Sequence, residues 1–306
     1  MAFFLAIDGG GSKTSCAVGD ETALLGKGSA GGSNVVRSGE AAAGRALLEA
    51  VQQACAAAQV SPRQITRTCV GLSGGDRPET AEPVRRMLAE FVSGEIEIVG
   101  DMEIALHAAF GGGAGVIVIA GTGSIAFGRN SRRRTVRAGG WGHAISDEGS
   151  GHWIGRCAVS HALRVYDEGE NPALLQRVMK AWGTESRDKL ILVANAAPGP
   201  DFASLFPVVA AAADTGDSTA KSVLAQAGAE LSGIAKVVIR RIFAGNEAIP
   251  VATAGSVFGN SALVRQVFYN SLRSEYPGVA VNPKVVEPLL GALDLARRTT
   301  PRATGA

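Results

Sequence analysis

Short apolar runs and glycine-rich breaks alternate with longer stretches of helical spacing along the chain. Apolar runs at residues 3–7, 14–18 and 24–28 predict three consecutive strands joined by tight turns. Apolar residues then recur with helical spacing up to about residue 58, and Ser38 is the expected N-cap of this helix. The alternation that follows, which is typical of an α/β fold, comprises strands at 68–72 and 96–99 and helices at 79–91 and 102–109.

A second meander begins behind the glycine break at residues 111–113. Its strands, at 115–120, 124–129 and 135–138, repeat the order of the first meander, with an apolar strand, a glycine-containing turn and a returning strand. This weak internal duplication predicts two related α/β lobes. We expect residues 1–112 to form the first lobe and residues 113–286 the second, with a C-terminal helix within 287–299 returning to the first.

The rest of the second lobe is expected to be mainly helical between residues 150 and 243. A strand at 250–254 ends on Gly255-Ser256, and helices follow near 261–274 and 288–298. We expect no ordered structure beyond Thr299.

Composition narrows the class of protein. A length of 306 residues is enough for two full cores, and 46% hydrophobic against 19% charged residues suits a compact chain. The 30 basic and 28 acidic residues leave a net charge of +2, so no overall field favours nucleic acid or an anionic membrane. The apolar start carries no basic leader and no 18-residue apolar run is seen, so we expect a cytoplasmic protein. The unusual feature is 40 glycines.

Two glycine-rich turns could bind phosphate. Asp8-Gly9-Gly10-Gly11-Ser12-Lys13-Thr14 stands between two predicted strands, where glycines let backbone N–H groups approach an anion. Ser12, Lys13 and Thr14 add hydroxyl and ammonium donors, and Asp8 is suited to holding a hydrated Mg²⁺. The segment lacks the P-loop spacing, and glycines also serve ordinary tight turns. A second turn, Gly121-Thr122-Gly123-Ser124, heads the second lobe and favours the functional interpretation.

Three further segments carry candidate chemistry. Asp101 follows a predicted strand, where a carboxylate can act as a general base or simply cap the next helix. Glycine at 255 would let an adenine ring lie against the backbone, although a plain strand-to-helix turn has the same pattern. The loop at 139–150 combines glycines with Trp141, Gly142 and Asp147, a mixture suited to a polyhydroxyl ligand or to an ordinary surface connection.

In this order and spacing, these segments resemble the N-acetylglucosamine kinase branch of the BadF/BadG/BcrA/BcrD ATPase family, within the sugar kinase, Hsp70 and actin superfamily. The resemblance runs from Ala6 to about Ala296. It implies two ribonuclease-H-like (actin-like ATPase) lobes around an interlobe cleft that binds nucleotide and sugar. Many relatives carry threonine where this chain has Ser12, which preserves the hydroxyl.

The resemblance also implies roles for individual residues. Asp101 matches the catalytic base, which would take a proton from the 6-hydroxyl of an amino sugar, most simply N-acetylglucosamine. The nucleotide with its Mg²⁺ would be held by Asp8, Gly10, Gly11, Ser12, Lys13, Thr14, Thr122, Gly123, Gly255 and Ser256. The sugar would be held by Asn34, Ser73, Gly74, Asp101, Thr122, Trp141, Gly142 and Asp147. ATP, Mg²⁺, an amino-sugar substrate and a homodimer are therefore expected.

Other functions remain to be weighed. Glucosamine or N-acetylmuramic acid could replace N-acetylglucosamine as substrate. The same family includes ATPases that activate 2-hydroxyacyl-CoA dehydratases through a shared iron-sulfur cluster, but Cys16, Cys55, Cys69 and Cys157 are too scattered for cluster ligands. A sugar-responsive DNA-binding regulator is disfavoured because the first strand leaves no room for a preceding helix-turn-helix. The arginine-rich 129–137 segment is more typical of a solvated hairpin than of a nucleic-acid site.

Overall fold

The computed structural model describes residues 1–35, 39–243 and 248–298. The chain divides into two compact units, one formed by Met1–Gly112 with Val286–Ala306 and the other by Gly113–Val285. Each unit contains one five-stranded sheet. Ser38, the expected helix cap, and the segment beyond Thr299 lie outside the described residues.

The sheet of the first unit has the strand order β3-β2-β1-β4-β5. Strands β1, β2 and β3 are antiparallel neighbours, whereas β1, β4 and β5 run parallel. The parallel strands place their carboxyl ends at one edge of the sheet. The strands are β1 (Phe3–Gly9), β2 (Thr14–Gly19), β3 (Leu24–Ala30), β4 (Ile65–Leu72) and β5 (Glu95–Gly100).

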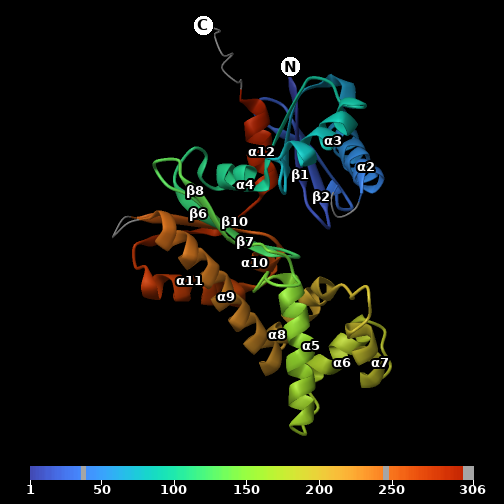
Figure 1. Ribbon diagram of the computed structural model, residues 1–306, viewed down its shortest axis with the longest axis vertical. Helices are drawn as coiled ribbons and strands as arrows, with labels where there is room; N and C mark the ends of the chain where they lie inside the picture. The colour runs from blue at the N-terminus through green and yellow to red at the C-terminus, as the bar shows by residue number, and fades with distance from the viewer. Residues whose placement is uncertain (36–38, 244–247, 299–306) are drawn as a thin grey trace. The chain divides into compact units, whose positions relative to one another are not determined.

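Helices cover both faces of this sheet because successive side chains of a strand point to opposite sides. Leu5 and Ile7 of β1 pack into a core with α2 and α3, whereas Ala6, between them, faces α4 and α12. Figure 1 shows α2 and α3 on one side of the sheet and α4 and α12 on the other. These helices are α2 (Glu40–Ala58), α3 (Pro78–Ala89), α4 (Asp101–Phe110) and α12 (Pro288–Arg297), and a short 3₁₀ turn, η1 (Pro62–Gln64), precedes β4.

The sheet of the second unit repeats the same topology. Its order is β10-β9-β6-β7-β8, so a meander of three antiparallel strands is again extended by a parallel strand beside the first. The prediction of an α/β fold with two such sheets is therefore confirmed. The strands are β6 (Gly115–Ala120), β7 (Ser124–Arg129), β8 (Thr135–Gly139), β9 (Ile249–Ala254) and β10 (Val279–Val286).

Strand β10 was not predicted from the sequence. It contains Asn282 and Pro283, which weaken a strand pattern, and it lies at the edge of the sheet, where a proline is tolerated. The predicted helix at 261–274 is confirmed as α11 (Ala262–Glu275), which Ser261 caps through its side chain, and a short helix, α10 (Ser256–Asn260), precedes it. The structure begins α2 at Glu40, with Gly39 as its N-cap.

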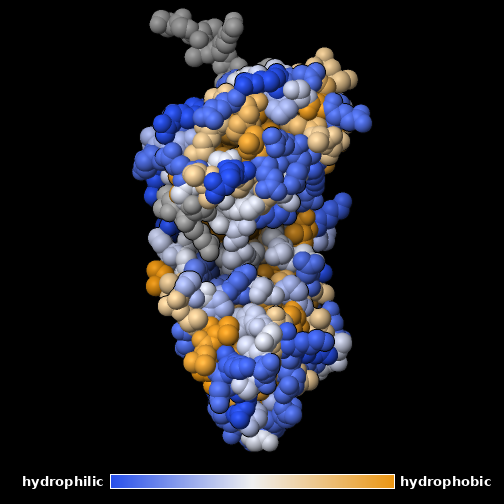
Figure 2. Space-filling model, turned by 90° about the vertical axis from the view of Figure 1, so that its right-hand side faces the viewer, coloured by the Kyte–Doolittle hydropathy of each residue, from blue (hydrophilic) through white to orange (hydrophobic). Residues whose placement is uncertain are grey.

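The longest helix that the structure describes in the second unit is α9 (Ser218–Ile242). By length and apolarity α9 could cross a membrane, but half of its most apolar stretch is buried against the unit. It packs on α11, α5, α8 and β7, as the core helix of a folded domain does. On the face drawn in Figure 2 hydrophobic residues form small separate areas in a mostly hydrophilic surface. The other helices are α5 (Gly151–Asp167), α6 (Ala173–Ala181), α7 (Arg187–Ala194), α8 (Phe206–Asp214) and the 3₁₀ turn η2 (Phe202–Leu205).

Two helical glycines of this unit differ in the room they leave. A Cβ on Gly155 of α5 would meet the Phe202 carbonyl oxygen at 1.9 Å, whereas a Cβ on Gly233 of α9 would meet nothing within 4 Å. We predict that Gly155→Ala lowers the free energy of unfolding by about 1–3 kcal/mol through overpacking. Gly233→Ala should raise it by about 0.5–1 kcal/mol, because alanine is the better helix former. Urea unfolding of both variants checks this pair, and equal effects of the two would contradict it.

Candidate functional site

The loop that follows β3 is hydrogen-bonded to the glycine-rich turn of the first unit. The Gly10 N–H donates to the Lys13 carbonyl at 2.9 Å, which closes the β1–β2 turn. The Ser33 N–H donates to the Gly10 carbonyl at 3.1 Å, and the buried Thr14 hydroxyl donates to the Gly31 carbonyl at 2.7 Å. Thr14 therefore holds the neighbouring loop, whereas the side chains of Ser12 and Lys13 are exposed at the turn.

Asp8 and Asp101 lie near one another at the carboxyl ends of the parallel strands. In the sheet register Asp8 of β1 and Val99 of β5 both pair with Gly71 of the intervening β4. Asp101 is the first residue of α4, after the N-cap Gly100, and its Oδ1 accepts the Met102 N–H at 2.9 Å. The capping position itself therefore belongs to Gly100, and the Asp101 carboxylate stands at the head of the helix.

The electrostatics of Asp8 reflect this neighbourhood. Burial, followed by repulsion from the Asp101 carboxylate, raises the pKa of Asp8 to about 6, while the Lys13 ammonium opposes the rise. A desolvated carboxylate with a second carboxylate beside it is also a suitable donor set for a divalent cation. The residues present thus fit a Mg²⁺ held by Asp8. Among the described residues, no group of three or more His, Cys, Asp or Glu side chains is arranged for a metal.

Asn34 and Ser73 come together beside the same turn. Both line a small cavity whose wall also includes Gly9, Ser33 and Thr80. Gly74, beside Ser73, has a φ of +75°, which turns the chain after β4. The Ser33 hydroxyl is fully buried and has no hydrogen-bond partner, and it lies 2.8 Å from where a Cβ on Gly9 would be. Sequence reasoning missed Ser33, whose position next to Asn34 was the available signal.

The second glycine turn is held by the start of α5. The Gly151 N–H donates to the Gly121 carbonyl at 2.8 Å, and the His152 N–H donates to the Thr122 carbonyl at 3.3 Å. The Ser124 hydroxyl donates to the Glu148 carbonyl at 2.7 Å. These bonds fix the turn against the end of the 139–150 loop and leave the Thr122 side chain exposed.

Asp147 links that loop to the turn. Its carboxylate accepts the backbone N–H groups of Ser124 and Gly142, and its side chain is 8% exposed. Burial raises the pKa of Asp147, and the two backbone hydrogen bonds work against the rise. Its φ of +67° is unusual for a residue with a side chain. The buried carboxylate therefore positions the loop and still has acceptor sites for a ligand hydroxyl.

Gly255 and Ser256 lie next to the second turn at the carboxyl ends of β9 and β6. Ile119 of β6 pairs with Ala254 of β9, and a Cβ on Gly255 would meet the Ala120 carbonyl oxygen at 2.3 Å. Both this close approach and the φ of +95° favour glycine at position 255. Within the second unit the structure thus brings together Thr122, Gly123, Gly142, Asp147 and Gly255, with Ser256 and Trp141 exposed alongside.

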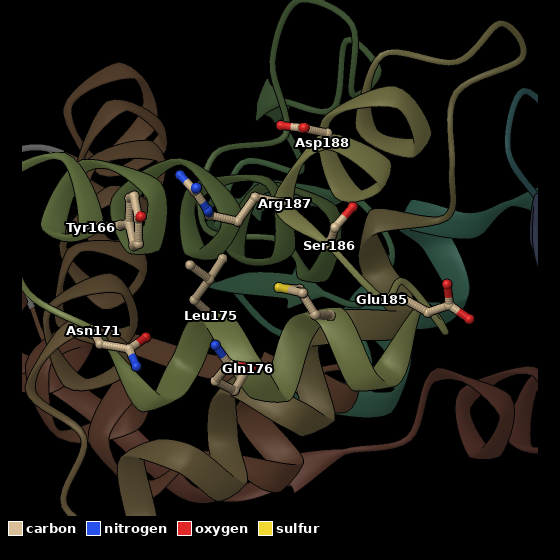
Figure 3. A pocket seen from close by; sticks show the side chains of 9 residues that line it. Tyr166, Asn171, Leu175, Gln176, Glu185, Ser186, Arg187 and Asp188 are labelled. Atoms are coloured by element: carbon tan, nitrogen blue, oxygen red, sulfur yellow. The ribbon is translucent and has the colours of Figure 1, made fainter.

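A separate cavity in the second unit lies away from every predicted site residue. Figure 3 shows it between α5, α6 and the start of α7, with Arg187 pointing in beside Tyr166. The Arg187 guanidinium stacks on the Tyr166 ring, 3.9 Å from its centroid. This cavity gives no support to the predicted nucleotide or sugar contacts. The four cysteines have free thiols. Cys16, Cys55 and Cys69 are buried, and Cys157 is half-buried.

The two sheets have the same strand order, and each carries a glycine turn at the carboxyl end of its middle strand, β1 or β6. A family model described as the BadF/BadG/BcrA/BcrD ATPase family matches residues 5–296, and the chain belongs to that family. The resemblance inferred from the motifs is confirmed.

Similar proteins are known by name and by structure. The chain is 34% identical to an N-acetylmuramic acid/N-acetylglucosamine kinase from Clostridium acetobutylicum, over 97% of this chain and 99% of that one. It is 27% identical to an N-acetyl-D-glucosamine kinase from Dictyostelium discoideum, over 96% and 97% of the two chains. A solved structure from Chromobacterium violaceum superposes with a TM-score of 0.74 at 25% identity and covers 97% of this chain and 99% of its own.

The raised pKa of Asp8 predicts a pH dependence of stability. Because the folded value of about 6 lies above the unfolded value, Asp8 favours the folded state below about pH 4, and this contribution is lost as the pH rises to about 6. In metal-free protein at pH 7, Asp8→Asn should therefore raise the free energy of unfolding, on the order of 3 kcal/mol. The gain should fade at pH 4.

Urea unfolding in EDTA across this pH range measures the effect. Asp76→Asn, which changes an exposed carboxylate of the same unit, is the control and should show little change at any pH. An Asp8→Asn gain that is the same at pH 4 and pH 7 would contradict the assignment.

The second turn offers a matched pair of glycines. A Cβ on Gly123 would lie 2.8 Å from Asp147 Oδ2, whereas a Cβ on Gly121 would meet nothing within 4 Å. We predict that Gly123→Ala displaces the Asp147 carboxylate. With Asp147 in the sugar-binding role that the resemblance implies, sugar affinity should fall by about 10-fold or more, the scale of a lost charged hydrogen bond. Gly121→Ala should bind sugar within about twofold of the parent. Titration calorimetry with N-acetylglucosamine compares them, and equal affinities would remove this role of Gly123.

Proposed function

We propose that the protein is an amino-sugar kinase that transfers the γ-phosphoryl group of ATP to the 6-hydroxyl of N-acetylglucosamine. The observation that carries the proposal is the Asp101 carboxylate at the head of α4, beside Asp8 and the glycine turn of the same unit. The named activities of the similar kinases from Clostridium and Dictyostelium support the class of substrate. Membership of an ATPase family supports ATP as the donor.

In this mechanism Asp101 is the general base. It accepts the proton of the 6-hydroxyl as that oxygen attacks the γ-phosphorus, so that the new O–P bond forms while the bond to the β-phosphate oxygen breaks and ADP leaves. A rigid position at a strand end matters because phosphoryl transfer depends on alignment more than on covalent help from the protein. The Met102 N–H bond to Oδ1 at 2.9 Å helps to keep the carboxylate oriented.

Each unit offers donors for the phosphate groups of ATP at its own glycine turn. In the first turn the Gly10 N–H closes the hairpin, so the donors proposed for phosphate are the backbone N–H groups from Gly11 onwards, with the Ser12 hydroxyl and the Lys13 ammonium. In the second turn the exposed Thr122 hydroxyl would serve. Thr14 is left out of this set because its hydroxyl is committed to Gly31. Mg²⁺, held by Asp8, supplies neutralisation of phosphate charge when it is bound.

The sugar would be oriented by hydrogen bonds to its hydroxyls. In the first unit the proposed partners are Asn34 and Ser73, which share a cavity wall. In the second unit, taken by itself, the proposed partner is Asp147. Gly255 and Ser256 would lie against the adenosine. An ADP-release assay with N-acetylglucosamine, N-acetylmuramic acid, glucosamine and glucose tests the substrate, and no ADP release with any of the three amino sugars would exclude the proposal.

The role of Asp101 gives a specific prediction. Asp101→Asn keeps the shape of the side chain but removes the base, so kcat should fall about 10²-fold or more, as general-base contributions do. The affinity for MgATP should stay within about twofold, since Asp101 is assigned to the sugar hydroxyl. Coupled-assay kinetics and a fluorescent nucleotide titration measure the two quantities. Asp76→Asn is the control, and full activity in Asp101→Asn would remove Asp101 from the mechanism.

A further inference from the structure

Arg137 and Trp141 form a built contact that the proposed kinase mechanism does not use. The Arg137 guanidinium carbon lies 4.2 Å from the centroid of the Trp141 ring. The indole is 62% exposed, so this contact is made at the surface of the second unit. Such a cation–π contact holds a long side chain that would otherwise sample many rotamers.

The backbone explains why these two side chains meet. In β8, Val136 and Ala138 face the core, so Arg137 between them points away from it. Gly139 and Gly140 then both have a positive φ, of 71° and 70°, which folds the chain back after the strand. This reversal returns Trp141 to the side of Arg137.

A hydrogen bond also holds the backbone of Arg137. The Arg241 guanidinium, near the end of α9, donates to the Arg137 carbonyl oxygen at 2.9 Å. The strand end that carries Arg137 is therefore tied to α9. Its stacked guanidinium uses one face for the indole, and its N–H donors, which lie in the guanidinium plane, stay available for a planar anion.

The aromatic partner of this guanidinium is joined directly to one of the proposed sugar contacts of the same unit. Trp141 is followed directly by Gly142, whose N–H donates to the Asp147 carboxylate. The residue that stacks on Arg137 and the residue that donates to the carboxylate proposed to hold a sugar hydroxyl are therefore consecutive in the chain.

The hairpin and the end of α9 carry basic side chains, and the 139–150 loop carries the carboxylates of Asp147 and Glu148. Arg132 and Arg134 are exposed on the same hairpin, and Arg240 and Arg241 end the neighbouring helix. Glu275 pairs with Arg240 at 3.5 Å and so offsets part of this charge. A carboxylate arriving at Arg137 gains from a bidentate fit to a planar fork.

We propose that Arg137 is a specificity-determining residue that binds the carboxylate of an acidic amino sugar. The inference rests on the proposed kinase function and extends its substrate class to N-acetylmuramic acid, which is N-acetylglucosamine carrying a lactyl ether, and hence a carboxylate, on O3. Arg137 is a binding residue for that substituent, and phosphoryl transfer at the 6-hydroxyl is unchanged. N-acetylglucosamine, which lacks the carboxylate, gains nothing from Arg137.

The test compares two sugars with two arginine variants. Steady-state ADP release is measured with N-acetylglucosamine and with N-acetylmuramic acid for the parent protein, Arg137→Gln and Arg134→Gln. Arg137→Gln should raise KM for N-acetylmuramic acid by about 10-fold or more, the scale of a charge-assisted hydrogen bond, and leave KM for N-acetylglucosamine within about twofold. Arg134→Gln removes the same charge from the same hairpin and should change both values by less than about threefold.

A second measurement leaves the protein unaltered and so does not depend on how a variant folds. The parent protein should show a KM about 10-fold or more higher for the methyl ester of N-acetylmuramic acid than for the free acid, because the ester is uncharged. Equal KM values for ester and acid would overturn the proposal, as would equal effects of the two arginine variants.

The outcomes also separate this inference from the kinase function on which it rests. Phosphorylation of N-acetylglucosamine but not of N-acetylmuramic acid would overturn the role of Arg137 and leave the kinase function standing. Phosphorylation of none of the amino sugars would overturn the kinase function itself.

Discussion

At the ends of the parallel strands, backbone segments pass one another so closely that no side chain fits between them. The candidate site depends on these close approaches. A Cβ on Gly32 would lie 2.2 Å from the Gly11 carbonyl oxygen, and one on Gly255 would lie 2.3 Å from that of Ala120. Each contact places a loop directly against a glycine turn. The turns can then be fixed by neighbouring main chain, as the Ser33 N–H bond to Gly10 shows, so side chains such as Ser12 remain exposed. A rigid turn with exposed donors is what tight binding of an anion needs.

The same crowding has an electrostatic cost. Asp8 and Asp147 are carboxylates whose pKa values are raised by burial, and Asp8 is raised further by Asp101. Their desolvation opposes folding, since a charge that leaves water must be compensated. Asp147 is compensated within the protein by the N–H groups of Ser124 and Gly142. The Lys13 ammonium attracts the Asp8 carboxylate, but the pKa of Asp8 remains raised. A bound cation would stabilise the ionised form of Asp8 further.

Much of the fold and part of the site were predictable from the sequence. Apolar runs and glycine breaks indicate both meanders, because strand period and turn chemistry are local properties. The edge strand β10 was missed, since Pro283 obscures its pattern and only its pairing in the sheet defines it. The sequence indicated Asn34 but not the buried Ser33 beside it, because burial of a hydroxyl is a tertiary property. The sequence also suggested a phosphate contact for Thr14. Its hydroxyl instead donates to the Gly31 carbonyl, a contact that only the tertiary structure shows.

The two units share one topology but differ in the chemistry at the head of the central strand. In the first unit Asp8 stands just before the end of β1, and Asp101 follows β5, so this unit offers carboxylates that suit a cation and a proton. In the second unit β6 runs directly into Gly121 and Thr122, and the nearby Asp147 is already bound to backbone N–H groups. The β7–β8 hairpin of this unit also carries the exposed side chains of Arg132, Arg134 and Arg137. Duplication of one fold can therefore supply opposite electrostatic functions, because topology fixes where a strand ends and a few residues there decide what it binds.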